Sequence, residues 1–518
     1  MKRRLLASLM TLVMMLSLLP TAVWARDTGS GDPQETEDTA EPTPQSKELD
    51  LADGSIVISA IGYTQGGVET KYTGAYTILQ TSRESTTNTI TVTGGDHTIT
   101  LNGVNIDVSG VSEGVPCAFA IESGKVTLVL ADGSENTLKS GWINKDNPDT
   151  GISYAGLWVQ EQAQVVIDGG TGKLAAVGGG SGSSELGNTS LAAGIGASCA
   201  HASNKKDPWK SNVGTITIEG GVITATGSAA GTYGGAGIGG GGNNSDITIT
   251  GGNVTANSGK TTTSGCAGIG SAYGQPGKKH IVIKDDAVVN ATGGSAGIGG
   301  GAYQDAGVIL IDGGTVTAKS NDVGAGIGGG GGVYGGDNMN INGSITISGG
   351  TVPAAGSSNG AGIGGGGGNK QAYADAGAQA SGNITISGGT VTAKGGTYAP
   401  GIGSGAIVNH NSCTAADVSG KMGTITISGG KVTAENGSSF ADGGKSYRVP
   451  SGNNNLDSGI GQGRNASEVS QAAFADWELQ TGNGGAVQLV AKESVSDLKR
   501  NGEAYNPATL VINRAEYY

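Results

Sequence analysis

The chain has 518 residues, of which 100 are glycine and only 4% are aromatic, and its formal net charge is −13. An acidic surface repels nucleic acid and anionic membranes, which argues against both as partners. Glycine at this density without a collagen-like period, together with few aromatic residues, excludes a conventional core filled by large rings. We therefore expect a repeated backbone geometry with thin apolar layers.

Residues 1–25 have the features of a signal peptide, with basic residues before an apolar run and small residues at its end. The apolar run, 5–19, is shorter than the roughly 20 residues that a spanning helix needs. We expect cleavage after Ala25, which leaves 27 Lys and Arg against 43 Asp and Glu. The predicted product is secreted and extracellular, has no membrane span, and carries neither a hydrophobic tail nor a sorting motif after Ala515.

Residues 26–50 are rich in acidic residues and proline and almost devoid of apolar ones, which predicts a disordered acidic linker. Residues 51–164 contain short alternating strands such as Ile90-Thr91-Val92, and we expect them to form the N-terminal β region and cap of the following repeats. Residues 466–518 lose the repeat but keep strand-like runs, which predicts a C-terminal cap or a small β unit.

Residues 165–465 repeat three short motifs. The first is an alternating strand before a Gly-Gly pair, as in Thr215-Ile216-Thr217-Ile218, and the second is a strand after the pair, as in Val222-Ile223-Thr224-Ala225. The third is Gly-Ile-Gly, centred on Ile195, Ile238, Ile269, Ile298, Ile327, Ile363, Ile402 and Ile460. Three strands per unit indicate stacked coils about 4.8 Å apart. The predicted fold is all-β: a right-handed parallel β-helix, a three-faced solenoid of Gly-rich rungs with end caps.

The segment Lys125–Leu138, which includes Leu-Ala-Asp-Gly-Ser-Glu-Asn-Thr-Leu, precedes Val165–Gly170 and the Gly-Ile-Gly units. In these features the chain resembles the secreted carbohydrate-binding parallel β-helix proteins of anaerobic Gram-positive bacteria. The resemblance covers about 85–463. It implies a non-catalytic protein that binds plant cell-wall or other polysaccharides and holds Ca²⁺ in acidic loops.

No catalytic group of residues is apparent, and we expect the protein not to be an enzyme. Pectate lyases resemble this fold, but no arginine occurs between Arg83 and Arg448, so an arginine base is not available, whereas a lysine base stays open. The adjacent carboxylates Asp285 and Asp286 are expected to form a structural corner. The four cysteines lack metal-ligand spacing and are expected to be small buried residues, with one disulfide left open.

Aromatic residues lie in the loops after Gly-Ile-Gly, where unit length varies, and aromatic faces stack on sugar rings. These candidate ligand-binding residues are Trp209, Tyr273, Tyr303, Tyr334 and Tyr373. Oxygen-bearing side chains at Asp146, Asn147 and Asp149 are candidate ligands for Ca²⁺. The alternative interpretations are that each aromatic residue only covers its own loop and that the oxygen-bearing side chains lie in solvated turns. The predicted function is polysaccharide binding, with a cell-surface adhesin or structural spacer, or a polysaccharide lyase, as alternatives.

Overall fold

The computed structural model describes the residues from 46 onward with gaps, and all of them belong to the compact unit Gln45–Tyr518. The described ranges are 46–143, 151–180, 192–200, 212–229, 234–240, 245–259, 265–272, 279–331, 343–357, 359–369, 382–397, 399–405, 407–408, 422–427 and 429–435, with short strands at 441–442, 445–446, 460–461, 487–489, 498–500, 503–505 and 510–512. The predicted signal peptide and most of the predicted linker lie outside these ranges.

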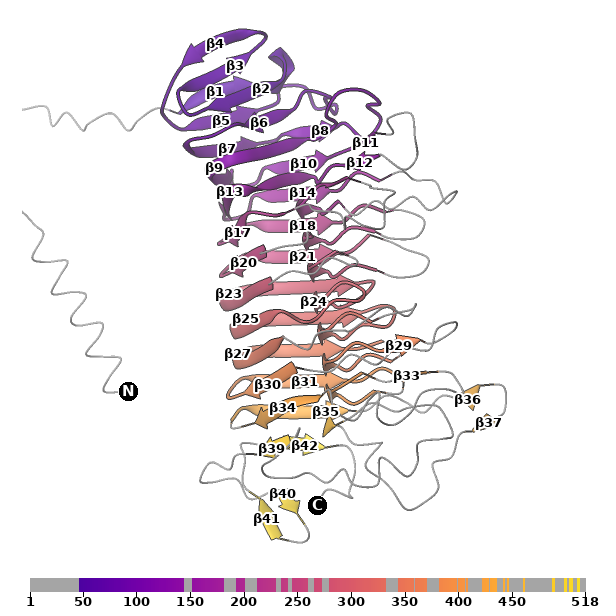
Figure 1. The fold of residues 1–518 in the computed structure, drawn as a ribbon. Helices are drawn as coiled ribbons and strands as arrows, with labels where there is room; N and C mark the ends of the chain where they lie inside the picture. Colours follow the sequence, from indigo (N-terminus) through magenta and orange to yellow (C-terminus); the bar gives the residue numbers. More distant parts are fainter. Residues whose placement is uncertain are drawn as a thin grey trace, which may run out of the picture. The chain divides into compact units, whose positions relative to one another are not determined.

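The strands stack in three parallel ladders, one for each face of a coil (Figure 1). Face 1 contains, in order, β2 (Ile56–Ser59), β6 (Ile90–Val92), β9 (Phe119–Leu130), β13 (Leu157–Gly169), β15 (Ile195–Gly196), β19 (Ile238–Gly239), β22 (Ile269–Gly270), β24 (Ile298–Gly299), β26 (Ile327–Gly328), β28 (Ile363–Gly364), β32 (Ile402–Gly403) and β38 (Ile460–Gly461). Each neighbouring pair in this ladder is parallel.

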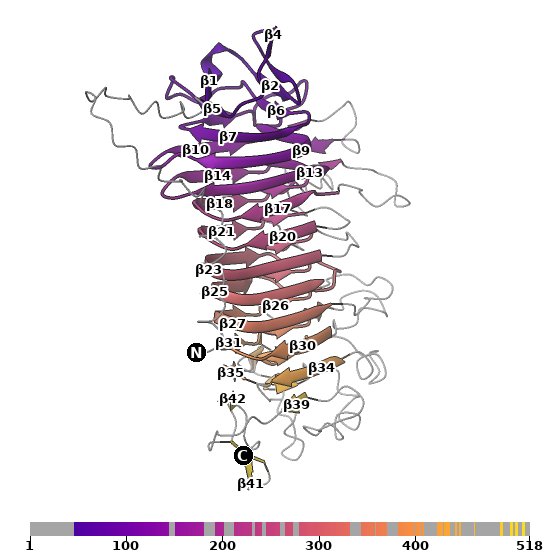
Figure 2. The same ribbon diagram turned by 90° about the vertical axis from the view of Figure 1, so that its left-hand side faces the viewer.

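Faces 2 and 3 are built in the same way, and long strands bend at a corner and serve two faces (Figure 2). Face 2 contains β1 (Lys47–Asp50), β5 (Tyr76–Leu79), β7 (Asp96–Asn102), β9, β13, β17 (Thr215–Ile218), β20 (Ser245–Ile249), β23 (Lys279–Gly293), β25 (Val308–Ser320), β27 (Ser344–Ala355), β30 (Gly382–Ile386), β34 (Met422–Ile427) and β39 (Val487–Leu489). Face 3 contains β8 (Asn105–Asp107), β10 (Glu135–Lys139), β14 (Lys173–Val177), β18 (Val222–Thr226), β21 (Asn253–Asn257), β23, β25, β27, β31 (Thr390–Lys394), β35 (Lys431–Glu435) and β42 (Leu510–Ile512).

This arrangement confirms the predicted right-handed parallel β-helix. Like residues stack on like along the interior, because the register of every pair keeps the inward positions aligned. On face 1, Ile238 pairs with Ile269, which pairs with Ile298, and the row continues to Ile327 and Ile363. All five side chains are completely buried, so each contributes roughly 1.5–3 kcal/mol of hydrophobic stabilisation.

The second glycine of Gly-Ile-Gly is required by the stacking. Gly299 has φ +124°, which L side chains rarely adopt, and a Cβ at this position would collide with the carbonyl of Gly328 in the next rung. The rungs therefore approach each other along face 1 more closely than any larger residue permits. This explains why glycine recurs there despite its entropic cost.

The structure moves three of the predicted domain boundaries. Lys47–Asp50, placed in the disordered linker, form β1, because Leu49 reaches the apolar interior above Ile78. The boundary predicted between 164 and 165 falls inside β13, so the region 51–164 already contributes complete rungs. In the region 466–518, β39 and β42 continue faces 2 and 3.

An antiparallel meander covers the N-terminal end of the stack. It consists of β2, β3 (Gly62–Gln65) and β4 (Val68–Lys71), with the short 3₁₀ helix η1 (Leu51–Asp53) before it. Tyr63 and Tyr72 pack edge-on against the buried ring of Tyr76, at centroid distances of 6.0 Å and 5.2 Å. Tyr63 and Tyr72 therefore pack against the apolar interior at this end of the stack.

The remaining described strands form small sheets outside the three ladders. They are β11 (Trp142–Ile143), β12 (Ile152–Ser153) and β16 (Cys199–Ala200) in one sheet, and β29 (Gly368–Asn369) with β33 (Ile407–Val408), β36 (Ala441–Asp442) with β37 (Lys445–Ser446), and β40 (Leu498–Arg500) with β41 (Glu503–Tyr505) in pairs. In the described part of the chain no helix has the length and hydropathy needed to cross a bilayer.

Candidate functional site

The connection 300–307 joins β24 on face 1 to β25 on face 2 and contains Tyr303, one of the predicted sugar-binding residues. A hydrogen bond of 3.0 Å from the Gln304 amide to the Gly301 carbonyl closes a four-residue turn. Backbone hydrogen bonds of 3.1 Å fix this turn to both neighbouring rungs, one from Ala302 to Gly265 and one from Tyr303 to Gly331. The position of Tyr303 is therefore set by the stack rather than by the turn alone.

Tyr303 has φ +65°, in the left-handed region that favours glycine. It occupies the third position of the turn, where type II turns take glycine or asparagine. A bulky residue in this conformation costs on the order of 1–2 kcal/mol, and such strain concentrates at functional positions. The half-buried Tyr303 is thus held in a strained backbone conformation that stability alone does not favour.

Polar side chains follow Tyr303 directly. Gln304 is 9% exposed, and its side-chain amide forms no hydrogen bond within the described part of the chain. The atoms of this side-chain amide are not completely buried. Asp305, half-buried, accepts a hydrogen bond of 3.2 Å from the Gly307 amide. Because this side-chain amide reaches the surface without a partner in the described residues, a hydroxyl group from outside the chain could bind to it.

The other predicted ligand-binding residues, Trp209, Tyr273, Tyr334 and Tyr373, lie outside the described residues, as do the predicted metal ligands Asp146, Asn147 and Asp149. The structure therefore neither brings them together nor separates them. In the part that is described, no group of three or more His, Cys, Asp or Glu side chains is arranged to hold a metal ion.

Two aromatic residues that the sequence analysis did not single out, Tyr154 and Trp158, lie together near the N-terminal end of the stack. Tyr154 packs edge-on against Trp158, with ring centroids 5.8 Å apart, and both adjoin a small cluster around the buried Cys117. Trp158 and Trp142 are half-buried, and Tyr154 is 6% exposed. The alternation Leu157-Trp158-Val159 is the signal that places Trp158 on the outside of face 1, because its two neighbours are buried in the interior.

The strands of the small sheet β11–β12–β16 neighbour, in the sequence, both these aromatic residues and the predicted sites. Trp142 lies on β11, the segment 144–150 with the three predicted metal ligands connects β11 to β12, and the segment with Trp209 follows β16. Figure 1 shows β11 and β12 on its right-hand side, and β29 and β33 on the same side further down. These described strands outside the three ladders therefore lie on one side of the stack.

Asn136, in the segment on which the family resemblance rests, serves the fold. It is 2% exposed and occupies an inward position of face 3, in register with Leu174. Its Oδ1 accepts hydrogen bonds of 3.0 Å from the amides of Gly103 and Val104, and its Nδ2 donates to the Ser134 hydroxyl and to the Lys173 carbonyl. One buried amide thus pairs four polar groups of three successive rungs.

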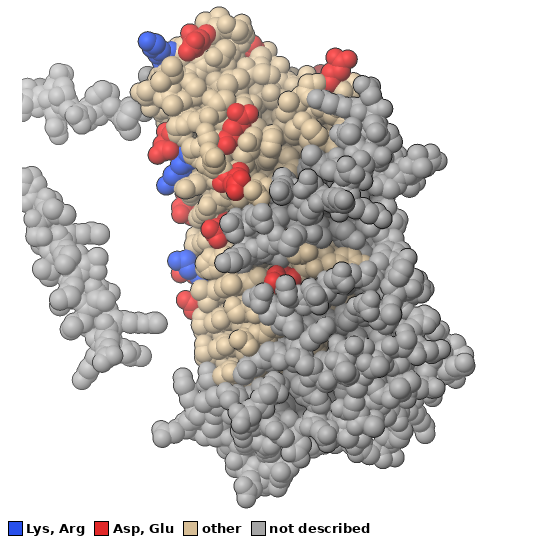
Figure 3. All heavy atoms as spheres, in the orientation of Figure 1, with Lys and Arg blue, Asp and Glu red and all other residues tan. Residues whose placement is uncertain are grey.

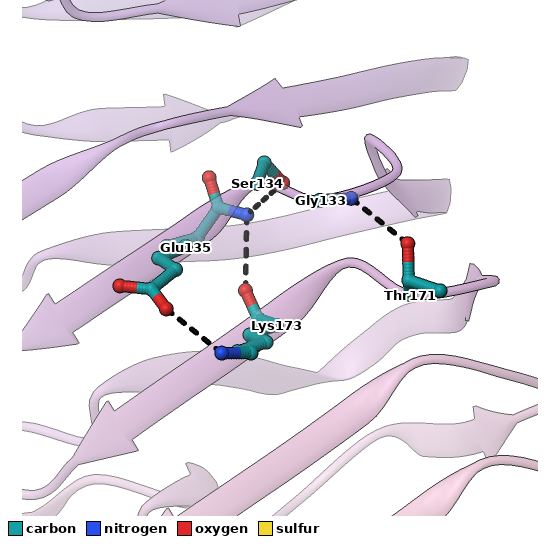
Figure 4. A network of polar contacts seen from close by, with 6 residues as sticks. Gly133, Ser134, Glu135, Thr171 and Lys173 are labelled. Carbon is teal, nitrogen blue, oxygen red and sulfur yellow. Dashed lines mark hydrogen bonds and ion pairs between the residues drawn. The ribbon is translucent and has the colours of Figure 1, made fainter.

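The neighbouring polar residues also bind one another (Figure 4). The Gly133 amide donates to the Thr171 hydroxyl, and Lys173 Nζ lies 2.8 Å from Glu135 Oε1. The hydrogen bond from Lys173 lowers the pKa of Glu135, and the one from the Thr171 backbone lowers the pKa of Asp132. This part of the segment is consequently a structural corner, and the carboxylates of Asp132 and Glu135 already have partners.

Charged groups elsewhere are dispersed. Figure 3 shows carboxylates scattered over the described face of the molecule, with fewer basic groups among them. The adjacent pair expected to form a corner, Asp285 and Asp286, is exposed, and Asp285 has φ +57° beside Gly313 of the next rung. Lys284 Nζ lies 3.5 Å from Asp285 Oδ2, which is an ion pair between exposed groups. Cys117 and Cys266 are buried, as expected for small core residues.

Comparison with known proteins bears on the repeat. No curated protein and no solved structure matches the chain. A family model described as a beta helix repeat matches residues 247–273, 281–302, 309–331, 345–367, 384–406 and 425–461. Each matched segment starts at an inward residue of face 2 and extends through face 3 to Gly-Ile-Gly or beyond, so the match follows the rungs. The chain is therefore similar to parallel β-helix proteins that are built from this repeat.

Proposed function

We propose that this chain is a secreted, non-catalytic protein that binds polysaccharide along the side of the solenoid where the connections after face 1 lie. The observation that carries the proposal is the turn 301–304. It places the half-buried Tyr303, in a strained backbone conformation, next to Gln304, whose side-chain amide has no partner in the described residues. A ring that stacks on a sugar and an amide that binds a hydroxyl are the two elements of a sugar-binding site.

The stacked geometry supports a polymeric ligand. Rungs repeat about every 4.8 Å, and one connection follows face 1 in each rung. Tyr334 and Tyr373 follow Gly-Ile-Gly in the next two units, so a row of rings at this side is expected to follow an extended chain of sugars. Binding of Ca²⁺ by Asp146, Asn147 and Asp149 is a further part of the proposal.

Retention on insoluble polysaccharides tests the function. The secreted protein is incubated with a panel of plant cell-wall and other glycans, with and without a chelator, and both the bound protein and the released sugars are measured. We expect retention on at least one glycan without release of product. Sugars with unsaturated ends would instead identify a lyase, and no retention on any glycan would favour the spacer alternative.

Replacement of the rings tests the site. Tyr303→Ala should weaken binding roughly threefold to tenfold, and the triple replacement of Tyr303, Tyr334 and Tyr373 should weaken it most. Tyr303→Phe keeps the ring and should retain binding, while Thr317→Ala, on the exposed surface of face 3, is the matched control. If the triple variant folds and binds as tightly as the parent protein, the site lies elsewhere.

A further inference from the structure

The cap of the solenoid ends in an open strand edge. β4 is the outermost strand of the meander β2–β3–β4, and within the described part of the chain it pairs only with β3. Two large apolar side chains of this hairpin are exposed to solvent, Val68 at the start of β4 by 65% and Ile61 just before β3 by 57%. An unpaired edge with exposed apolar neighbours is a template for the addition of another strand.

The turn between β3 and β4 determines which backbone groups of β4 face outward. Gly66 and Gly67 both have positive φ, +58° and +76°, as in the type I′ turn of a two-residue hairpin. In such a hairpin the flanking pair Gln65–Val68 exchanges both hydrogen bonds, and the next pair does not. Hydrogen bonds to β3 thus alternate along β4, and the amides and carbonyls of Glu69 and Lys71 point to the open edge.

This edge is complementary to itself. If a second copy of β4 is added antiparallel with Thr70 opposite its own counterpart, Glu69 of each copy lies opposite Lys71 of the other. The outward-facing backbone groups then meet and form about four hydrogen bonds. Opposite charges at directly facing positions stabilise an antiparallel pair, and a two-fold axis at Thr70 produces both pairs at once.

The apolar residues agree with the same register. Residues 68, 70 and 72 share one face of the strand, because side chains alternate, and Val68 would lie opposite Tyr72 of the second copy. The Tyr72 amide donates a hydrogen bond of 3.2 Å to the Ile61 carbonyl, so Ile61 is adjacent to Tyr72 across the sheet. Pairing would therefore cover the exposed Val68 with Tyr72 and Ile61 of the second copy.

We propose that two copies of this protein associate through their caps by antiparallel pairing of β4, centred on Thr70. Charged residues on an edge strand normally discourage association with other strands. Here the charges of Glu69 and Lys71 favour pairing with a second copy in antiparallel register and disfavour pairing with a copy in parallel register. The interface is small and reversible, and its effect is to join two solenoids, which doubles the number of binding positions in one particle. This proposal does not depend on the nature of the ligand.

Charge exchange tests the interface on the full secreted chain, by sedimentation velocity over a range of protein concentrations. The parent protein is expected to show a concentration-dependent monomer–dimer equilibrium. Glu69→Lys and Lys71→Glu each place like charges opposite each other and should raise the dissociation constant at least about tenfold. The double variant Glu69→Lys with Lys71→Glu restores opposite pairs and should restore the dimer.

The control is Lys431→Glu, which changes an exposed charge on face 3 and should leave the equilibrium unchanged. A parent protein that stays monomeric at all concentrations would overturn the proposal. So would a double variant that dimerises no better than the single ones, because recovery by charge exchange requires Glu69 and Lys71 to face each other.

Discussion

The backbone strain at Tyr303 predicts an unusual order of stability for two variants, Tyr303→Gly and Tyr303→Ala. Glycine and alanine both remove the ring, and they differ at this position only in the conformations that the backbone adopts easily. In an ordinary extended segment the glycine variant is less stable than the alanine variant by roughly 0.5–1 kcal/mol. At φ +65° we expect the reverse order.

The magnitude follows from two opposing terms. A residue with a Cβ pays on the order of 1–2 kcal/mol in the left-handed region, whereas glycine adopts it without steric cost. Glycine loses roughly 0.5–1 kcal/mol more chain entropy when the turn orders. The difference leaves Tyr303→Gly more stable than Tyr303→Ala by about 1 kcal/mol, which corresponds to about a fivefold difference in the local opening equilibrium.

Amide hydrogen exchange over residues 300–307 measures this opening locally, which is necessary because long repeat arrays do not unfold in two states. The Tyr303→Ala variant should exchange about five times faster than Tyr303→Gly, while both lose polysaccharide binding to the same extent. Equal exchange, or slower exchange in the alanine variant, would refute the left-handed conformation and with it the argument that Tyr303 is held in place for binding.

Two further predictions concern buried polar groups. Asn136→Leu should destabilise the fold by roughly 2 kcal/mol in denaturant unfolding, although leucine is the residue at the same inward position of the next rung, because the Gly103 and Val104 amides lose their acceptor. Burial raises the pKa of Asp322 to about 6 from 3.8, so the protonated form is favoured in the folded state. The contribution of this half-buried group to the folding free energy, about 1–2 kcal/mol after allowance for solvent screening, is present below pH 3.8 and lost as the pH rises through 6. The difference in unfolding free energy between Asp322→Asn and the parent should therefore change across this range and be constant above it.

The sequence was sufficient to predict the repeated body of the fold. Period-two alternation around residues such as Ile216 and Ile218 identifies an inward face, and the glycines of Gly-Ile-Gly identify the tight stacking of face 1. The first rungs lack this signal. Phe119 and Leu157 occupy the Gly-Ile-Gly row without flanking glycines on both sides, so the start of the stack at β1 and β2 was not apparent.

The details of the candidate site were less accessible from the sequence. The conformation of Tyr303 depends on hydrogen bonds to Gly265 and Gly331, which belong to other rungs, and no local pattern encodes them. Asn136 interrupts an apolar row for the same reason, since its partners Gly103 and Val104 come from the preceding rung. Trp158, in contrast, was predictable from its outward position between two inward residues.

The fold explains how the connections between faces can vary while the stack remains intact. Each rung contacts only its neighbours, and the aligned row Ile298, Ile327 and Ile363 is kept although the connections 300–307 and 329–343 differ in length. Substitutions at the exposed positions of such connections are therefore expected to change the surface of the proposed binding site at a small cost in stability. Tyr303 is less free to vary, because hydrogen bonds fix its turn to the preceding and the following rung. The left-handed conformation of Tyr303 persists only because the hydrogen bonds to Gly265 and Gly331 hold it.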